Sequence, residues 1–178
     1  MRAGENGVTM ERMIIMRHGE AQRPAPGLED FERALDATGR AESRGIGRAL
    51  AEAGLAPDVA LVSGAARTQE TWRCAAEAFS EANVLVDDSL YAASAARLAG
   101  AVKVAAPLGR TVILVGHNPG VHQYAVHLAR QAGASAKEAA PLFDRFPTGT
   151  AVVFRMDAEG QAAFERIFLA KHYRDAAR

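Results

Sequence analysis

The stretch that decides the fold is Met13-Ile14-Ile15-Met16-Arg17-His18-Gly19-Glu20, in which four apolar residues run directly into a polar turn. An uninterrupted apolar run of this length is typical of a strand that is buried on both faces of a parallel sheet. Parallel sheets bind their ligands beyond the carboxyl ends of the strands, which is where the polar half of this stretch falls. The eight residues therefore predict a central strand and, directly after it, a place for chemistry.

Strands and helices alternate along the rest of the chain. We expect further strands at residues 59–62, 84–86 and 111–115, and two closing strands, joined by a hairpin turn, at residues 150–155 and 163–169. Helices are expected at residues 36–53, 66–79, 94–105 and 121–131. This alternation predicts a three-layer α/β/α sandwich, in which helices cover both faces of a mostly parallel central sheet and the closing pair of strands makes an antiparallel edge.

The size and charge of the chain limit the class of protein and the kinds of partner that can be expected. Its 178 residues suffice for one domain with a core, and its 49% hydrophobic and 24% charged content is ordinary for a soluble globular protein. The formal net charge of zero argues against a broad electrostatic grip on nucleic acid or on an anionic membrane. No stretch reaches the roughly 20 apolar residues that a membrane span needs. We therefore expect neither nucleic acid nor a membrane as a partner, and nothing in the sequence demands more than a monomer.

A single domain at residues 13–172 contains all the predicted elements. Residues 1–12 have no apolar segment, which predicts a disordered extension or a true start of translation at Met10 or Met13. Residues 173–178 are expected to form a C-terminal tail. Cys74 is the only cysteine, so no internal disulfide can form, which fits the reducing environment of the cytoplasm. Its apolar neighbours predict that the thiol is packed and inert.

Three of the predicted strands end in polar turns of unusual composition. The first turn is Arg17-His18-Gly19-Glu20, the second is Ser63-Gly64-Ala65-Ala66-Arg67-Thr68, and the third is Gly116-His117-Asn118-Pro119. Because the carboxyl ends of parallel strands meet at one edge of a sheet, we expect two arginines and two histidines to gather there. The helices that follow the second and third turns would add backbone N–H donors and positive dipole ends to the same edge.

Such a group of side chains suits a phosphoryl group. Its oxygens carry negative charge through the transfer, and the planar fork of a guanidinium matches their geometry. One histidine can attack the phosphorus while it is neutral, and the other can donate a hydrogen bond. The sequence therefore predicts transfer of a phosphoryl group at this edge.

The three turns, in this order and each after an apolar strand, resemble those of the histidine phosphatase superfamily. Within it, the short chain, the Arg-His-Gly-Glu-Ala start at residues 17–21, the stretch at residues 66–71 and the stretch at residues 115–119 are similar to the SixA-type phosphohistidine phosphatases. The resemblance covers residues 13–169. It implies a phosphoglycerate mutase-like fold and a phosphatase that needs neither a metal nor an organic cofactor.

The resemblance also implies a role for each central residue. His18 would be the nucleophile that becomes phosphohistidine, and Arg17 and Arg67 would clamp the phosphoryl oxygens. His117 would complete the pocket and stabilise the group in transfer, after which water would hydrolyse the intermediate. Asn118 is a candidate phosphate contact, although turn or cap chemistry favours a structural role for it.

The proton donor is the part of the pattern that the sequence leaves open. Many members of the superfamily carry an acidic residue after the third strand, but residues 87–93, Asp-Asp-Ser-Leu-Tyr-Ala-Ala, offer no carboxylate that aligns with that role. Glu20, two residues past His18, is the other candidate donor. Two further histidines, His122 and His127, fall on the helix after the third turn, where a structural or surface role is expected for both.

The open proton donor bears on the substrate. An alkoxide leaving group has a parent acid with a pKa near ~15.7 and benefits strongly from a positioned acid. The imidazole that leaves phosphohistidine has a conjugate acid with a pKa of ~6.5 and departs with far less help. The sequence thus favours a phosphohistidine protein or another phosphoramidate, with a small phosphate ester or sugar phosphate as the alternative. A non-catalytic phosphate-binding or phosphoprotein-binding module is the third reading, which the intact nucleophile argues against.

Overall fold

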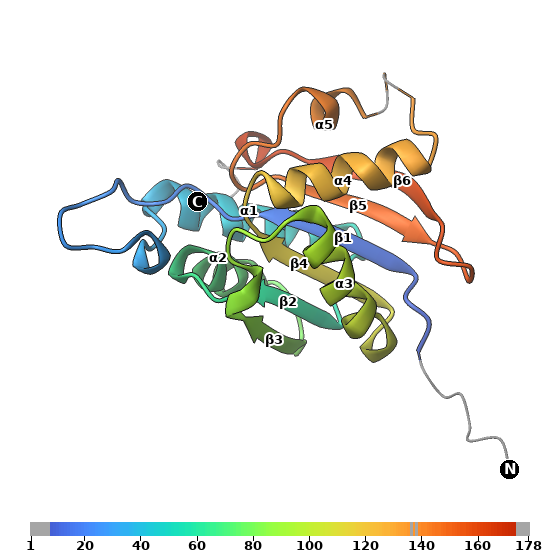
Figure 1. The fold of residues 1–178 in the computed structure, drawn as a ribbon, viewed down its shortest axis with the longest axis horizontal. Coiled ribbons are helices and arrows are strands. Elements are labelled where there is room, and N and C mark those ends of the chain that lie inside the picture. The colour runs from blue at the N-terminus through green and yellow to red at the C-terminus, as the bar shows by residue number, and fades with distance from the viewer. Residues whose placement is uncertain (1–7, 136, 138, 174–178) are drawn as a thin grey trace, which may run out of the picture.

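The computed structural model describes residues 8–135, 137 and 139–173. Their strands form one six-stranded sheet in the order β3-β2-β4-β1-β5-β6 (Figure 1). The strands are β1 (Arg12–Arg17), β2 (Val59–Ser63), β3 (Asn83–Asp87), β4 (Thr111–Gly116), β5 (Ala151–Met156) and β6 (Ala162–Phe168). The α-helices are α1 (Ala37–Glu52), α2 (Ala66–Ala76), α3 (Ala95–Ala105), α4 (Gly120–Gln131) and α5 (Ala140–Asp144).

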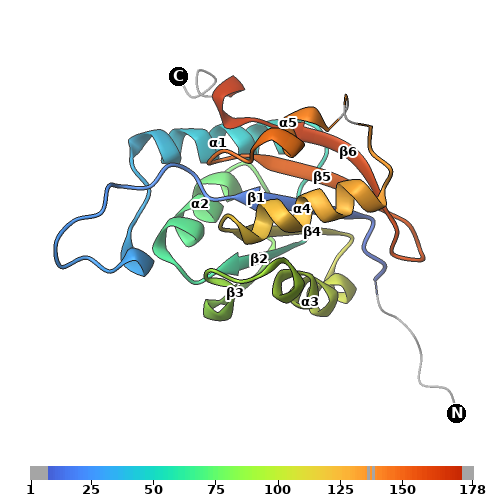
Figure 2. The same ribbon diagram turned by 45° about the horizontal axis from the view of Figure 1, so that its top comes forward.

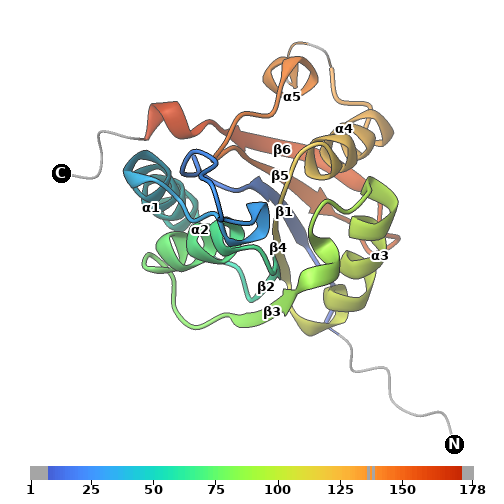
Figure 3. The same ribbon diagram turned by 60° about the vertical axis from the view of Figure 1, so that its left-hand side comes forward.

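The sheet is mixed, and its direction changes next to β1. Strands β3, β2, β4 and β1 pair in parallel, whereas β5 pairs antiparallel with both β1 and β6. Helices α1 and α2 cover one face and α3 and α4 cover the other, as the view of Figure 3 shows. The predicted three-layer sandwich, mostly parallel with an antiparallel edge, is confirmed.

Strand β1 joins the two hydrophobic cores. Met13 and Ile15 pack in the core under α3 and α4, and Ile14 and Met16 pack in the core under α1 and α2. All four side chains are fully buried. The alternating side chains of a strand point to opposite faces, so an apolar residue is needed at every position of a strand with helices on both sides. This explains why the quoted stretch is continuously apolar.

The N-terminal boundary of the domain differs from the predicted one. Residues 1–7 of the predicted extension lie outside the described residues, but Arg12 already belongs to β1. The backbone N–H of Glu11 donates to the carbonyl oxygen of Arg110 over 2.7 Å, and its carbonyl oxygen accepts from Met156 over 2.8 Å. Pairing with both neighbouring strands thus orders the chain before Met13. Of the predicted tail, residues 174–178 lie outside the described residues, and the ring of Tyr173 packs against Phe168.

Two loops frame the sheet edge at which the polar turns lie. The loop between β1 and α1 projects from the body of the molecule beside α2 and carries a short 3-10 helix, η1 (Asp30–Glu32) (Figures 1 and 2). The second loop, between α4 and β5, contains α5, which the sequence did not predict. Leu142 and Phe146 of this loop are buried in the core under α4. Helix α2 ends at Ala76, three residues before its predicted end at residue 79.

Cys74 on α2 is 6% exposed, and burial raises the pKa of its thiol. This agrees with the predicted packed and inert side chain. Among the described residues, none of the helices combines the length and the apolar character that crossing a bilayer requires.

Candidate active site

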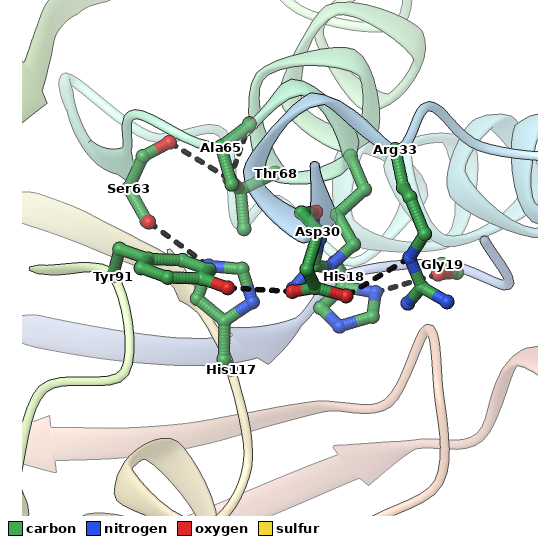
Figure 4. Close-up of polar contacts among 10 residues, drawn as sticks. His18, Gly19, Asp30, Arg33, Ser63, Ala65, Thr68, Tyr91 and His117 are labelled. Atoms are coloured by element: carbon green, nitrogen blue, oxygen red, sulfur yellow. Dashed lines mark hydrogen bonds and ion pairs between the residues drawn. The ribbon is translucent and has the colours of Figure 1, made fainter. Parts of the chain in front are cut away.

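The four residues expected to gather at the sheet edge do so. His18 follows β1, Arg67 lies in the first turn of α2, and His117 follows β4. The ring centroids of His18 and His117 are 5.1 Å apart, which places the two imidazoles side by side (Figure 4). Arg17 and Arg67 both lower the pKa of His18 through their charge, as two guanidinium groups close to its ring must.

His18 is held from three sides and is only 7% exposed. Its backbone N–H donates to Gly116, and its carbonyl oxygen accepts from Gly149. Ring atom Nδ1 lies 2.7 Å from the carbonyl oxygen of Gly19, so Nδ1 carries the hydrogen and donates it. The lone pair of a neutral ring is then on Nε2, where a nucleophile needs it.

The charge state of His18 follows from its surroundings. Burial lowers its pKa to about 4, and the charges of Arg67, Arg17 and Arg33 act in the same direction, whereas the hydrogen bond to Gly19 opposes them. The ring is therefore neutral near pH 7. A neutral imidazole between guanidinium groups is a ready nucleophile toward a phosphorus atom whose oxygens those groups attract.

Gly19 lets the turn approach α1 closely. A Cβ atom at this position would lie 2.7 Å from the carbonyl oxygen of Gly39 and 2.9 Å from Oγ of Ser43. The backbone N–H of Gly19 donates to Oγ1 of Thr71 on α2 over 3.0 Å. The turn that carries His18 is thus fixed against both helices of one face, and a larger side chain at position 19 would displace it.

His117 is as buried as His18, with 7% of its surface exposed. Its Nε2 lies 2.9 Å from Oγ of Ser63, at the end of β2. Burial, together with the charges of His18 and Arg67, lowers the pKa of His117 to about 3. The ring of Tyr91 packs edge-on against it, with centroids 5.3 Å apart. His117 is therefore a neutral hydrogen-bonding group near pH 7.

The two predicted clamps each keep an inner N–H without a partner among the described residues. Arg17 donates from Nη1 to the carbonyl oxygen of Phe146 over 3.0 Å, and its Nε is buried and unpaired. Arg67, with 7% of its side chain exposed, uses Nη1 and Nη2 on Asp30, and its Nε is likewise buried and unpaired. Buried donors normally have partners, so the two guanidinium groups bring unused hydrogen-bonding capacity to the edge at which His18 lies.

Asp30 is the part of the site that the sequence reasoning missed. Its carboxylate accepts from Arg67 over 2.8 Å and from the hydroxyl of Tyr91 over 2.6 Å, and Nε of Arg33 lies 3.0 Å away (Figure 4). These contacts lower the pKa of Asp30, and the hydrogen bond from Tyr91 has the largest effect. It is ionised near pH 7, so it holds Arg67 and does not serve as a proton donor. Asp30 belongs to a loop rich in proline, glycine and charge, where no pattern singled it out.

Glu20 and Asn118 lie at the rim of the site, near Arg17. Glu20 is exposed, and its Oε2 accepts from the hydroxyl of Thr148 over 3.0 Å. Asn118 donates from Nδ2 to the carbonyl oxygen of Phe146 over 3.0 Å, the same oxygen that Arg17 contacts. Both residues line an open cavity of about 560 Å³ with Arg17 and Thr148. The amide of Asn118 thus anchors the loop between α4 and β5, a structural contact to a residue distant in sequence and not a cap of its own turn.

The remaining candidates are accounted for by local structure. His122 pairs through Nε2 with the carbonyl oxygen of Leu142 at 2.7 Å and stacks on Phe146, so it supports the α5 loop. His127 is exposed. Asp87 accepts from the backbone N–H of Ser89 and caps the turn after β3. Within the described ranges, no three histidine, cysteine or acidic side chains are grouped so that they could hold a metal ion.

Comparison with known proteins gives the class to which this geometry belongs. The model of the histidine phosphatase superfamily (branch 1) matches residues 13–106, more than half of the chain. The chain belongs to this superfamily. An uncharacterized chloroplastic protein of Arabidopsis thaliana is 32% identical over 136 residues, which cover 71% of this chain and 61% of the relative. The chain thus spans about three fifths of that relative's length.

Solved structures show which members of the superfamily the chain is similar to. A protein from Agrobacterium tumefaciens assigned as phosphohistidine phosphatase SixA has 26% identity and a TM-score of 0.78, over 89% of this chain and 98% of that one. Phosphoglycerate mutase from Plasmodium falciparum shares the fold, with a TM-score of 0.61 at 18% identity over 92% of each chain. The resemblance to the SixA-type branch and the phosphoglycerate mutase-like fold are confirmed. The histidine phosphatase superfamily and the similarity to SixA support the expected phosphatase, a hydrolase, whereas the mutase shows only the shared fold.

Proposed function

We propose that this protein hydrolyses phosphohistidine on a protein, through a phosphohistidine intermediate on His18. The observation that carries the proposal is the setting of His18. Its Nδ1 is committed to Gly19, its Nε2 is free, and its pKa of about 4 keeps it neutral. On either side, Arg17 and Arg67 each hold a buried N–H that lacks a partner among the described residues. A neutral nucleophile between unpaired cationic donors suits an anionic phosphoryl group.

The reaction has two steps. In the first, Nε2 of His18 attacks the phosphorus, the bond to the substrate's ring nitrogen breaks, and the electron pair returns to that nitrogen, so that a substrate ring protonated on its other nitrogen leaves as neutral imidazole. Arg17 and Arg67 bind the phosphoryl oxygens and His117 donates a hydrogen bond to them. In the second step, water attacks the same phosphorus and loses a proton to the solvent, the bond to Nε2 breaks and its electron pair returns to Nε2 of neutral His18, and orthophosphate leaves. Since neither step uses a metal ion, we expect turnover to be unaffected by a chelator.

The acid-base setting favours a good leaving group. Of the described carboxylates near His18, Asp30 is ionised and spent on Arg67, and Glu20 is exposed and bonded to Thr148. Neither carboxylate is buried next to His18, where a general acid that donates to the leaving group would lie. The imidazole of phosphohistidine leaves with little help, because its conjugate acid has a pKa of ~6.5. Phosphohistidine is therefore the preferred substrate, and a small phosphate ester is the second candidate, favoured only by the position of Glu20 in the cavity beside Arg17.

The test is a comparison of turnover on a phosphohistidine protein, p-nitrophenyl phosphate and a sugar phosphate. We expect kcat/KM to fall in that order. Glu20→Gln should leave the first two nearly unchanged. A sugar phosphate that is turned over fastest, and that is slowed selectively by Glu20→Gln, would show that a small phosphate ester is the substrate and that Glu20 is the proton donor.

A further inference from the structure

Two buried side chains from neighbouring strands meet behind the site. Ser63, the last residue of β2, is fully buried, and its Oγ lies 2.9 Å from Nε2 of His117. The other ring nitrogen of His117, Nδ1, lies on the side of the ring that faces Asp30 and His18 (Figure 4). That nitrogen is buried and has no partner among the described residues. One nitrogen of His117 is therefore fixed from behind while the other faces the place of reaction.

The short contact can be read in two directions, because a hydroxyl both donates and accepts. If Ser63 accepted a hydrogen from Nε2, its own hydroxyl hydrogen would be buried with no acceptor, since His117 is its only side-chain partner among the described residues. If Ser63 donates to Nε2, its hydrogen is used, and the hydrogen left without a partner among the described residues is the one on Nδ1 of His117. That hydrogen lies on the side of the ring that faces the site, where a phosphoryl oxygen can accept it, whereas the hydroxyl hydrogen of Ser63 would have no acceptor even with a ligand bound, so the second direction is favoured.

We propose that Ser63 is a positioning residue whose hydroxyl donates to Nε2 of His117 and so places the ring's one hydrogen on Nδ1, facing the phosphoryl group. The proposal rests on the proposed function, because it assigns His117 the task of donating to that group. A bare lone pair on Nδ1 would face the negatively charged phosphoryl oxygens and repel them, whereas an N–H there attracts them.

The surroundings of His117 make the choice of nitrogen matter. Burial, His18 and Arg67 lower its pKa to about 3, so near pH 7 the ring has a single hydrogen to place. A cationic ring would present an N–H on both nitrogens and would need no help from Ser63. In a neutral ring the second partner decides which nitrogen is the donor. The ring next to it follows the same rule, since the Gly19 carbonyl oxygen places the hydrogen of His18 on Nδ1.

The direct test is nitrogen NMR on the full chain labelled with 15N at its five histidines. Long-range proton–nitrogen correlation at pH 7 distinguishes a ring nitrogen that bears hydrogen from one that does not, and His117→Gln assigns the signals by their loss. We expect hydrogen on Nδ1 of His117 in the wild type. Hydrogen on Nε2, or an even mixture of the two forms, would overturn the proposal even if no variant could be made.

Variants test whether Ser63 is the cause. Ser63→Ala should move hydrogen from Nδ1 toward Nε2, and Ser63→Thr, which keeps the hydroxyl, should restore the wild-type signals. Thr68→Val is the matched control, because it removes a buried hydroxyl that bonds to the carbonyl oxygens of Ser63 and Ala65 but does not touch His117. A Ser63→Ala spectrum that is identical to the wild type would show that Ser63 does not set the hydrogen.

Steady-state kinetics with p-nitrophenyl phosphate tests whether the position of the hydrogen on the His117 ring affects the reaction. Ser63→Ala should lower kcat about 10- to 100-fold, as expected when a transition-state donor is misplaced, with little change in KM. An unchanged kcat in a variant whose hydrogen has moved would overturn the role in the reaction. A wild type that hydrolyses no phosphate compound would instead refute the proposed function, and the nitrogen spectrum would still decide the direction of the Ser63 bond.

Discussion

His18 concentrates several requirements in one residue. Its ring must be neutral, its hydrogen must be on Nδ1, and its Nε2 must face a group of positive charge, and each requirement is met by a different part of the chain. Burial keeps the ring neutral, and the carbonyl oxygen of Gly19 places the hydrogen on Nδ1. Arg17 and Arg67 supply the positive charge near the ring. The tripeptide at residues 17–19 could be read from the sequence, but the resulting chemistry depends on residue 67, fifty positions later.

Replacement of His18 by alanine should abolish turnover without unfolding the protein. The loss in kcat should be at least about 10³-fold, because no other described side chain offers a free ring nitrogen at this position. Steady-state kinetics measures the loss, and circular dichroism measures the fold. His127→Ala, which removes an exposed histidine, is the control and should be fully active.

Trapping experiments give the complementary result for His18. Rapid quenching of the wild type with labelled substrate should leave acid-labile phosphate on His18. An acid-stable label on another residue, or substantial activity in His18→Ala, would mean that the nucleophile has been misassigned.

At the scale of elements, the loop that carries η1 decides how Arg67 is presented. Asp30 accepts from both terminal nitrogens of Arg67, whose Nε has no partner among the described residues, while the hydroxyl of Tyr91, after β3, donates to the carboxylate of Asp30. The site is thus closed by contacts among three separate segments. Because the carboxylate is ionised and paired, its contribution is to orientation, and removal of its charge should loosen the guanidinium.

Asp30→Asn should therefore lower kcat/KM toward p-nitrophenyl phosphate about 10- to 100-fold, since one hydrogen bond to a charged group is worth roughly 1.5–3 kcal/mol. Tyr91→Phe, which removes a neighbouring bond to the same carboxylate but leaves the Arg67 contact in place, should have a smaller effect. Inhibition by orthophosphate tests the opposite possibility, in which Asp30 hinders binding of the phosphoryl group. A gain in kcat/KM together with tighter phosphate inhibition would mean that Asp30 competes with the substrate for Arg67.

The same elements show how far the sequence could be read. Strands β1, β2 and β4 were predictable because burial on both faces demands continuous apolar residues, and their polar ends located Arg17, His18, Arg67 and His117. Asp30 and α5 were not predictable, since a five-residue helix has almost no periodicity and a loop carboxylate resembles any solvated charge. The partnership of Ser63 with His117 was hidden as well, because it depends on the pairing of β2 with β4.

At the scale of the whole molecule, two buried neutral histidines make stability depend on pH. Folding lowers the pKa of His18 to about 4 and that of His117 to about 3, whereas both are near 6.5 when unfolded. Below pH 6.5 the unfolded chain binds protons that the folded chain does not. The free energy of unfolding is therefore unaffected by these groups above about pH 7 and falls as the pH is lowered through 6.5.

Between pH 6.5 and pH 5 the loss should be about 1.6 kcal/mol for each histidine, from about 1.36 kcal/mol per pKa unit once the half protonation of the unfolded chain at pH 6.5 is included. Urea denaturation at a series of pH values measures it. The double variant His18→Gln/His117→Gln is the comparison and should show a much flatter dependence over this range. Equal slopes in the two proteins would show that the histidines are not neutral in the folded state.

The central position of β1 has a consequence for how this protein unfolds and loses activity. Its backbone is paired on both edges, with β4 and with β5, and its side chains hold both cores, so its amide hydrogens should exchange with solvent only when the entire domain opens. The proposed nucleophile, His18, directly follows that strand. Partial opening of the outer loops could then lower the proposed activity, but irreversible loss of the surroundings of His18 should coincide with global unfolding, so the activity that remains should be proportional to the fraction of folded molecules.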